Sequence, residues 1–121
     1  MIGAIAAKKA ANKAIDILVD RTPVDTSLAV SNWRVGINSS PVGIVAPHGR
    51  EATRTIAKAE IATYQGGGQI VIVNNVEYIG MLNIGSSSQD PGGFIEAAEQ
   101  AAELAEKQIQ FEIEHLLRKD I

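Results

Sequence analysis

The sequence predicts a single α+β domain spanning residues 1–121, in which a small, mainly antiparallel sheet is flanked by an N-terminal helix, a middle helix and a long C-terminal helix. Near both ends of the chain, apolar residues recur every three or four positions, the period of an amphipathic helix. Between them, residues 31–37 alternate and residues 70–73 form a β-branched run, both typical of strands. The apolar content of 45% is that of a folded domain with one core.

The first predicted helix has an apolar stripe made mostly of alanine. A stripe of small side chains buries little area, so we expect this helix to pack closely against its neighbours. Pro23 ends it, because the residue before a proline is pushed out of helical dihedral angles. The stripe consists of Ala4, Ala7, Ala11, Ala14 and Leu18.

The middle of the chain predicts a strand, a turn and a helix. Along residues 31–37 one face carries Trp33, which we interpret as a core aromatic rather than an interface residue. Residues 42–46 are a possible second strand, weakened by a glycine. A helix is expected over residues 49–64, and its exposed side carries Arg50, Arg54 and Lys58.

The second half predicts a buried strand and a long helix. Residues 70–73 are too short a run for a helix and are expected to form a central strand covered on both faces. Residues 78–84 return towards the core as either a strand or a helical turn, and the pattern leaves both open. From Ile95 to Leu116 one apolar stripe predicts about seven helical turns, longer than a domain of this size needs.

Composition limits the classes of function. The chain has no cysteine, which excludes disulfides, thiolate metal sites and a cysteine nucleophile. No apolar run approaches the roughly 20 residues of a membrane span, so we expect a soluble protein without membrane contact. The net charge of −3 argues against a protein that coats nucleic acid.

The charges are distributed unevenly along the chain. Lysines gather near the start and glutamates near the end, a polarity that suits head-to-tail contact between copies. Two solvated helix faces are the simpler explanation of the same pattern. The residues concerned are Lys8, Lys9 and Lys13 at the start and Glu96, Glu99, Glu103, Glu106, Glu112 and Glu114 at the end.

We find no pattern that indicates an enzyme. His48 and His115 do not have the spacing of a helical metal site, and residues 86–88 lack the G-x-S-x-G turn of a serine nucleophile. The glycines at 66–68 precede a strand and no Gly-Lys-Ser/Thr follows, which disfavours a phosphate loop. The sequence therefore predicts no catalytic residue, no metal and no cofactor.

Two other interpretations of the sequence would give the protein a nucleic-acid partner. Three carboxylates would have to gather around Mg²⁺ in a nuclease, although two of them also fit an exposed helix face. Scattered arginines can contact phosphates, although no reading helix accompanies them. The carboxylates are Asp16, Asp20 and Asp25, and the arginines are Arg21, Arg34, Arg50 and Arg54.

Two segments together carry a resemblance. Residues 21–27, R-T-P-V-D-T-S, followed by S-N-W-R-V at 31–35, resemble the T-P-V-D-T-G segment and Trp-bearing strand of small tail-completion and neck proteins of tailed bacteriophages. Residues 73–95 are similar to the N-N-x-x-Y-x-x-x-L-x-x-G-x-S-x-Q-x-P-x-G pattern of that family. Ser27 replaces a usual glycine, and Asn83-Ile84 replaces a commonly acidic and polar pair.

The resemblance supplies candidate interface residues. From the residues themselves, we interpret the first loop, residues 21–27, as a rigid polar corner that sets the sheet. We interpret the second loop, residues 85–93, as the partner-facing element, because it leads into the predicted long acidic helix. The matching positions are Pro23, Asp25, Thr26, Trp33, Asn75, Tyr78, Leu82, Gly85, Ser87, Gln89, Pro91 and Gly92.

The resemblance also implies a structural role in the virion. Copies would form a hexamer-like ring at the head-tail junction, assembled in the host bacterial cytoplasm, that joins the tail to the capsid connector. Partners would be other neck and tail proteins, with passing DNA contacted non-specifically if at all. The alternatives are a tail terminator or other minor tail protein and, in another class, a nucleic-acid-binding regulatory protein.

Overall fold

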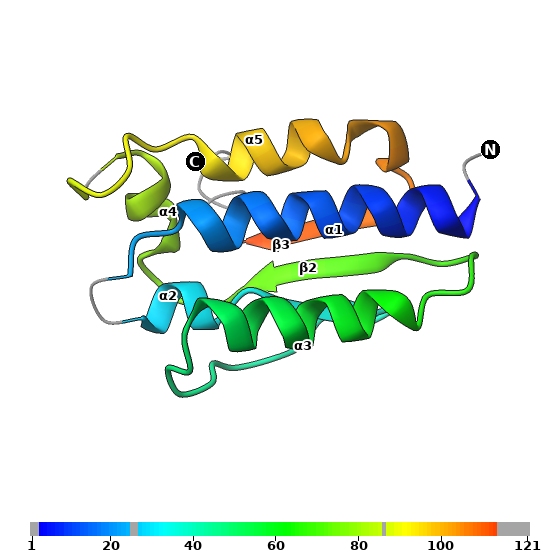
Figure 1. The fold of residues 1–121 in the computed structure, drawn as a ribbon, viewed down its shortest axis with the longest axis horizontal. Helices are drawn as coiled ribbons and strands as arrows, with labels where there is room; N and C mark the ends of the chain where they lie inside the picture. The colour runs from blue at the N-terminus through cyan, green and yellow to red at the C-terminus, as the bar shows by residue number, and fades with distance from the viewer. Residues whose placement is uncertain (1–2, 25–26, 86, 114–121) are drawn as a thin grey trace.

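The computed structural model describes residues 3–24, 27–85 and 87–113, and its fold is α+β, as the sequence predicts (Figure 1). Five α-helices, one 3₁₀ turn and three strands lie in this part of the chain. In chain order they are α1 (Ala4–Arg21), α2 (Leu28–Ser31), β1 (Arg34–Ile37), α3 (Arg50–Ala62), β2 (Ile70–Asn74), α4 (Ile79–Asn83), α5 (Phe94–Ala101), η1 (Glu103–Ala105) and β3 (Ile109–Ile113).

The sheet is mixed rather than mainly antiparallel. Its strand order is β1-β2-β3, with β1 antiparallel to β2 and β3 parallel to β2. The parallel pair follows from the connection, because a chain that leaves β2 and crosses over through α4 and α5 re-enters the sheet in the same direction. The central strand β2 is buried along its whole length, as predicted.

The predicted long C-terminal helix is wrong. Helix α5 ends at Ala101, and residues 109–113 form β3 instead. Ile109 and Ile113 stand four apart, and Phe111 lies between them at a spacing of two, so the same side chains satisfy a helical and a strand period. The free backbone edge of β2 decides between them by offering hydrogen bonds along its length. The end of the predicted helix, residues 114–117, lies outside the described residues.

Helix α1 lies at the centre of the helical layer. Figure 1 shows it running between α5 and α3, in front of the strands. Ala7, Ala11 and Ala14 are completely buried, so the alanine stripe allows the close packing that the sequence predicts. Ile15, Leu18 and Val19 are also fully buried and fill the space beneath.

Trp33 is a core residue, as predicted. Its side chain is 1% exposed, and its indole Nε1 donates a hydrogen bond of 2.8 Å to Thr22 Oγ1. Thr22 in turn donates to the carbonyl of Leu18 in the last turn of α1. The strand predicted from about residue 31 begins only at Arg34, because residues 28–31 form the short helix α2.

The possible strand at residues 42–46 does not form. These residues belong to an irregular loop, residues 38–49, whose backbone is held by side chains. Asn32 accepts from Val45 N at 2.7 Å and donates to Val45 O at 3.0 Å. Ser31 Oγ accepts from the amides of His48 and Gly49. Because these side chains satisfy the loop's polar groups, it needs no neighbouring strand.

The two remaining helices follow the sequence pattern. The helix predicted over 49–64 is confirmed as α3. For residues 78–84, where strand and helix were both open, the chain forms the helix α4. Its end leads directly into the second loop, so α4 fixes where that loop begins.

We expect Gly36→Ala to destabilise the fold by about 1–3 kcal/mol, as overpacking does. A Cβ atom at this position in β1 would lie 2.1 Å from Ser39 O and 3.0 Å from Pro41 Cδ, because loop 38–49 covers the strand here. Urea unfolding measures the change. Gly3→Ala is the matched control, since a Cβ there meets nothing within 4 Å; equal losses in both variants would contradict the packing.

Candidate functional site

The two loops that the sequence singled out meet at one end of the molecule. We call this meeting of residues 21–24 and 27 with residues 85 and 87–93 the loop junction. Arg21 donates from Nε to Asp90 Oδ2 and from an Nη atom to Asp90 Oδ1, both at 3.0 Å. The same Nη atom donates to Gly92 O at 2.8 Å. This two-pronged pairing fixes direction as well as distance.

Asp90 is the buried acceptor of the loop junction. It is 8% exposed, and its Oδ1 also accepts from Gly92 N at 2.7 Å. The hydrogen bond from Arg21 lowers the pKa of Asp90 below its ordinary value; the backbone amide of Gly92 and the charge of Arg21 add to this, while burial acts in the opposite direction. The carboxylate is therefore the form that the folded loop requires.

A second contact joins the loops through Gln89. Its side-chain Oε1 accepts a hydrogen bond from Val24 N at 2.8 Å, and its backbone N–H donates to Ser87 Oγ at 3.1 Å. Pro23 is buried beside this contact. Asp25 and Thr26, which the sequence selected, lie outside the described residues.

Four positions of the junction have left-handed backbone: Ser27, Gly85, Gly92 and Gly93. Ser27 has φ of 60°, a region that glycine occupies without strain. Gly85 and Gly92 have φ of 94° and 98°. A Cβ on Gly85 would lie 2.6 Å from Pro91 O, and one on Gly92 would lie 2.5 Å from Asn83 O. The two ends of the second loop therefore touch backbone to backbone.

Asn83 connects α4 to α5. It is 4% exposed, and its Oδ1 accepts from Ile95 N at 2.9 Å, a free amide of the first turn of α5. Its Nδ2 donates to Glu96 Oε1 at 2.7 Å, and its carbonyl accepts from Gly93 N. Asn83 thus caps α5 from another element, a role that α5's own flanking glycine cannot perform.

The structure sorts the predicted site residues. Gly85, Ser87, Gln89, Pro91, Gly92 and Pro23 belong to the loop junction, whereas Trp33 is buried in the core. Asn75 donates to the carbonyls of Pro41 and Gly43 and so supports loop 38–49. Tyr78 is 40% exposed at the start of α4, and Leu82 packs partly against the core.

Sequence reasoning missed three residues that organise the junction: Arg21, Asp90 and Asn83. Arg21 and Asp90 are 69 positions apart, and no local pattern signals a pair at that distance. Asp90 bonds Arg21 and Gly92 and makes no bond to an amide of α5 that the structure shows. For Asn83, the only sequence feature that could have drawn attention to it was its departure from the pattern that residues 73–95 resemble.

The arginines proposed for DNA contact bind protein groups instead. Arg50 donates to Val19 O at 2.9 Å and Thr22 O at 3.2 Å, which satisfies carbonyls at the end of α1. Arg34 donates to the carbonyls of Val42 and Gly43. The prediction of an exposed arginine side on α3 is therefore wrong for Arg50, which faces α1.

Arg54 and Lys58 of α3 bind two of the three carboxylates proposed for a nuclease, Asp16 and Asp20. Arg54 pairs with Asp16 at 2.6 Å and with Asp20, and Lys58 reaches Asp16 at 2.9 Å. Burial raises the pKa of Asp16, but the hydrogen bonds from Lys58 and Arg54 outweigh it and the net shift is downward. The hydrogen bonds that Arg54 donates to Asp20, Glu51 and Asp16 raise its pKa. Within the described residues no cluster of His, Cys, Asp or Glu is arranged to hold a metal ion.

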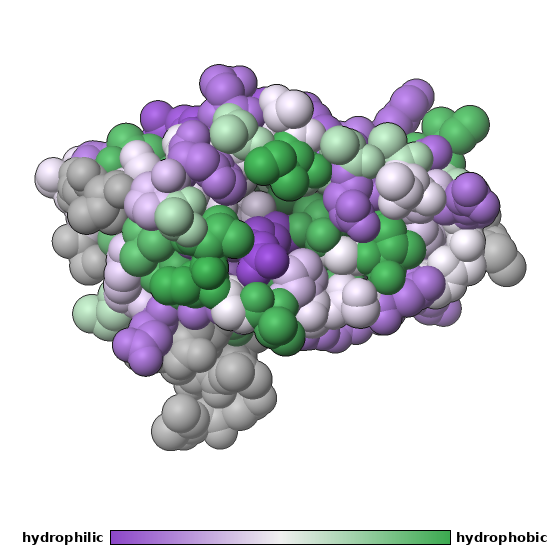
Figure 2. Space-filling model, turned by 90° about the horizontal axis from the view of Figure 1, so that it is seen from below, coloured by the Kyte–Doolittle hydropathy of each residue, from purple (hydrophilic) through white to green (hydrophobic). Residues whose placement is uncertain are grey.

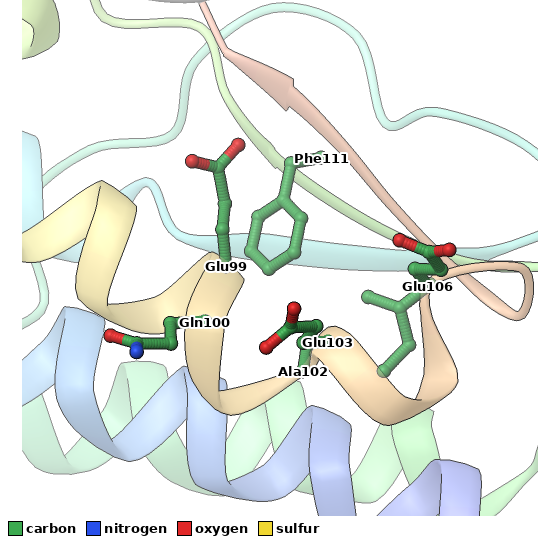
Figure 3. A pocket seen from close by; sticks show the side chains of 7 residues that line it. Glu99, Gln100, Ala102, Glu103, Glu106 and Phe111 are labelled. Atoms are coloured by element: carbon green, nitrogen blue, oxygen red, sulfur yellow. The ribbon is translucent and has the colours of Figure 1, made fainter.

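An open pocket of about 440 Å³ lies between α5, η1 and the edge strand β3 (Figure 3). Its floor is apolar, formed by Ala102, Ile109 and Phe111. Its rim is acidic, and Figure 3 shows the carboxylates surrounding the ring of Phe111. The rim residues are Glu99, Gln100, Glu103 and Glu106.

Among the helices that the structure describes, none is long and apolar enough to cross a membrane. Comparison of the chain with protein-family models, with curated proteins and with solved structures finds no match in any of the three.

We expect Asp90→Asn to remove part of the acid sensitivity of the protein. The folded carboxyl has a lowered pKa, so the unfolded chain takes up the proton more readily, and Asp90 stabilises the fold above about pH 4 and loses that effect as the pH falls further. At pH 7 the loss on substitution should be about 1–3 kcal/mol. Urea unfolding between pH 2.5 and 7 measures both. Glu77→Gln, at an exposed position, is the control; parallel pH curves for D90N and the unchanged chain would contradict the pairing.

We expect Asn83→Ala to cost about 1–3 kcal/mol, because the buried amide of Ile95 loses its acceptor. Asn83→Asp should cost less: it keeps that acceptor but places a second carboxylate beside Glu96, so salt should reduce its loss. Urea unfolding gives the free energies, and amide exchange at Ile95 reports the cap directly. Unchanged exchange at Ile95 in the Ala variant would show that Asn83 does not cap α5.

Proposed function

We propose that the chain is a structural subunit of a tailed-bacteriophage virion that works at the head-tail junction as a tail-completion or neck protein. In this role copies form a ring around the DNA passage and join the tail to the capsid connector. The observation that carries the proposal is the loop junction. The two separate segments that resemble the phage family, residues 21–35 and 73–95, come together there.

In the loop junction, several of the motif residues hold the two loops against each other. Arg21 and Asp90 tie the loops, Gln89 receives the amide of Val24, and the glycines allow the backbones to touch. A loop held at so many points has one shape, and loops with a specified shape on a small scaffold usually recognise a partner. An assembly subunit needs such a surface more than it needs a reactive group.

Exposed apolar side chains lie next to the junction. Tyr78 is 40% exposed, Met81 is 46% exposed and Ile84 is 72% exposed, all in or beside α4. Apolar side chains gathered near a rigid loop are typical of a protein-binding surface. This surface supports a role in which the second loop faces another virion protein.

The distribution of cations supports passage of DNA rather than its capture. Arg21, Arg34, Arg50 and Arg54 are held by carbonyls or carboxylates of the chain. A ring built from such subunits offers few arginines to phosphates, so DNA slides through it. A regulatory protein that reads DNA needs the opposite arrangement, with arginines free to reach base edges.

Labelling of intact particles tests the proposal. Antibody-gold against this chain, on particles of the virus that encodes it, should mark the junction of head and tail. Label at the capsid shell or absence of the chain from purified particles would contradict the proposal. Label along the tail instead would favour the alternative of another minor tail protein, and label at the end of a tail assembled without a head would favour a tail terminator.

A variant of the exposed apolar surface sharpens this test. Met81→Asp should leave the fold intact, because the side chain is nearly half exposed, but should yield unjoined heads and tails. Thr55→Asp, at an exposed position on α3, is the control. Normal particles from the Met81 variant would show that this surface does not join virion parts.

A further inference from the structure

The pocket beside β3 has acidic side chains around an apolar floor, and the exposed face of α1 carries lysines beside an apolar side chain. The two surfaces are therefore complementary in charge, and each offers apolar area to the other. We infer that the pocket of one copy receives the N-terminal half of α1 from a second copy, so that each subunit offers one donor face and one acceptor pocket. The inference rests on the proposed function only in taking another copy as the partner. It goes further by assigning the surfaces that meet.

The acceptor pocket lacks a cation of its own. Its lining includes Glu99, Glu103 and Glu106, and none of the hydrogen bonds or ion pairs found among the described residues joins these carboxylates to a lysine or arginine. Phe111, which forms the apolar floor with Ala102 and Ile109, is only partly buried. Carboxylates around an apolar hollow select an apolar side chain flanked by positive charge.

The donor face supplies that chemistry. Ile5 is 70% exposed, and Lys9 and Lys13 follow at intervals of four on the exposed side of α1. Residues four apart lie on the same face of a helix, so one apolar side chain and two cations form one stripe. The first turn of α1 has no acidic residue, so its positive dipole adds to the lysines.

Within one molecule the two surfaces belong to different elements. Lys9 and Lys13 are exposed on α1, whereas the pocket is lined by residues of α5, η1, β3 and their connections, and no described residue of α1 lines it. Two different surfaces that meet between copies form a heterologous contact, which gives a ring where the rotation between copies closes and a filament where it does not. Each copy then uses the contact twice, which compensates for the modest area of a single helix end.

The other apolar surface is a weaker candidate for this contact. Val42 is 85% exposed, Ile44 is 56% exposed, and Ile56 of α3 is 59% exposed. On the face shown in Figure 2, apolar areas are separated by strongly polar ones. No acidic or basic stripe elsewhere in the described chain matches that mixed surface as the lysines match the pocket.

Charge reversal with rescue tests the assignment. Association of the purified full chain is measured by sedimentation velocity at low salt. Lys9→Glu with Lys13→Glu should weaken it at least about tenfold, and Glu103→Lys with Glu106→Lys should do the same, since repulsion replaces attraction at exposed pairs. A chain that carries all four changes should regain association. Circular dichroism checks that each variant is folded. Glu77→Lys is the control, because Glu77 is exposed but belongs neither to α1 nor to the lining of the pocket.

The outcomes separate the inference from the proposed function. If both double variants associate like the unchanged chain, or the fourfold variant fails to recover while folded, the contact is wrong. If deletion of residues 114–121 abolishes association and the lysine changes do not, the occupant is the C-terminal segment and the inference is overturned. If the rescue succeeds but the chain is absent from particles, the contact stands and the proposed function fails.

Discussion

The C-terminal end of α1 is the point on which the rest of the structure depends. The last carbonyls of a helix have no partner within it, so they must be satisfied from elsewhere. Arg50 of α3 reaches two of them, at Val19 and Thr22. Thr22 Oγ1 accepts a hydrogen bond from the indole Nε1 of Trp33, and Arg21 donates hydrogen bonds to the carboxylate of Asp90. The middle helix, the residue that precedes β1 and the second loop are therefore all attached to residues 19–22.

This arrangement also decides the electrostatic character of the protein. The arginines at 21, 34, 50 and 54 satisfy carbonyls and carboxylates inside the fold, and the charges left outside are mainly lysines on α1 and glutamates beside β3. Arginine suits the inner role because its planar group serves several acceptors at once. Charges exposed on the surface act over a longer range and are screened by salt.

Rigidity is concentrated where the chain is least regular. Loop 38–49 is held by side chains of Ser31, Asn32, Arg34 and Asn75, and the second loop by Arg21 and by backbone contact between Gly85 and Gly92. Such loops keep one conformation without strand pairing, so little ordering entropy remains to be lost when a partner binds. A small scaffold can thus present shaped surfaces without enlarging its core.

The sequence by itself determined the elements whose signal is local. The alanine stripe of α1, the β-branched run of β2, the helix α3 and the buried place of Trp33 all follow from periodicity and residue type. The two loops also stood out, because proline, glycine and small polar residues specify turns. Even so, the pattern from Ile109 to Ile113 fitted both helix and strand, and local propensity favoured the wrong one.

Tertiary structure decided what depends on distant partners. The edge of β2 drew residues 109–113 into a parallel strand, and this made the sheet mixed. The pairing of Arg21 with Asp90 across 69 positions and the capping of α5 by Asn83 arise only after α4 and α5 have packed. A charged or amide side chain can find its hydrogen-bond partner at any distance along the sequence. The sequence therefore indicated the two loops separately, and only the tertiary structure shows that they contact each other.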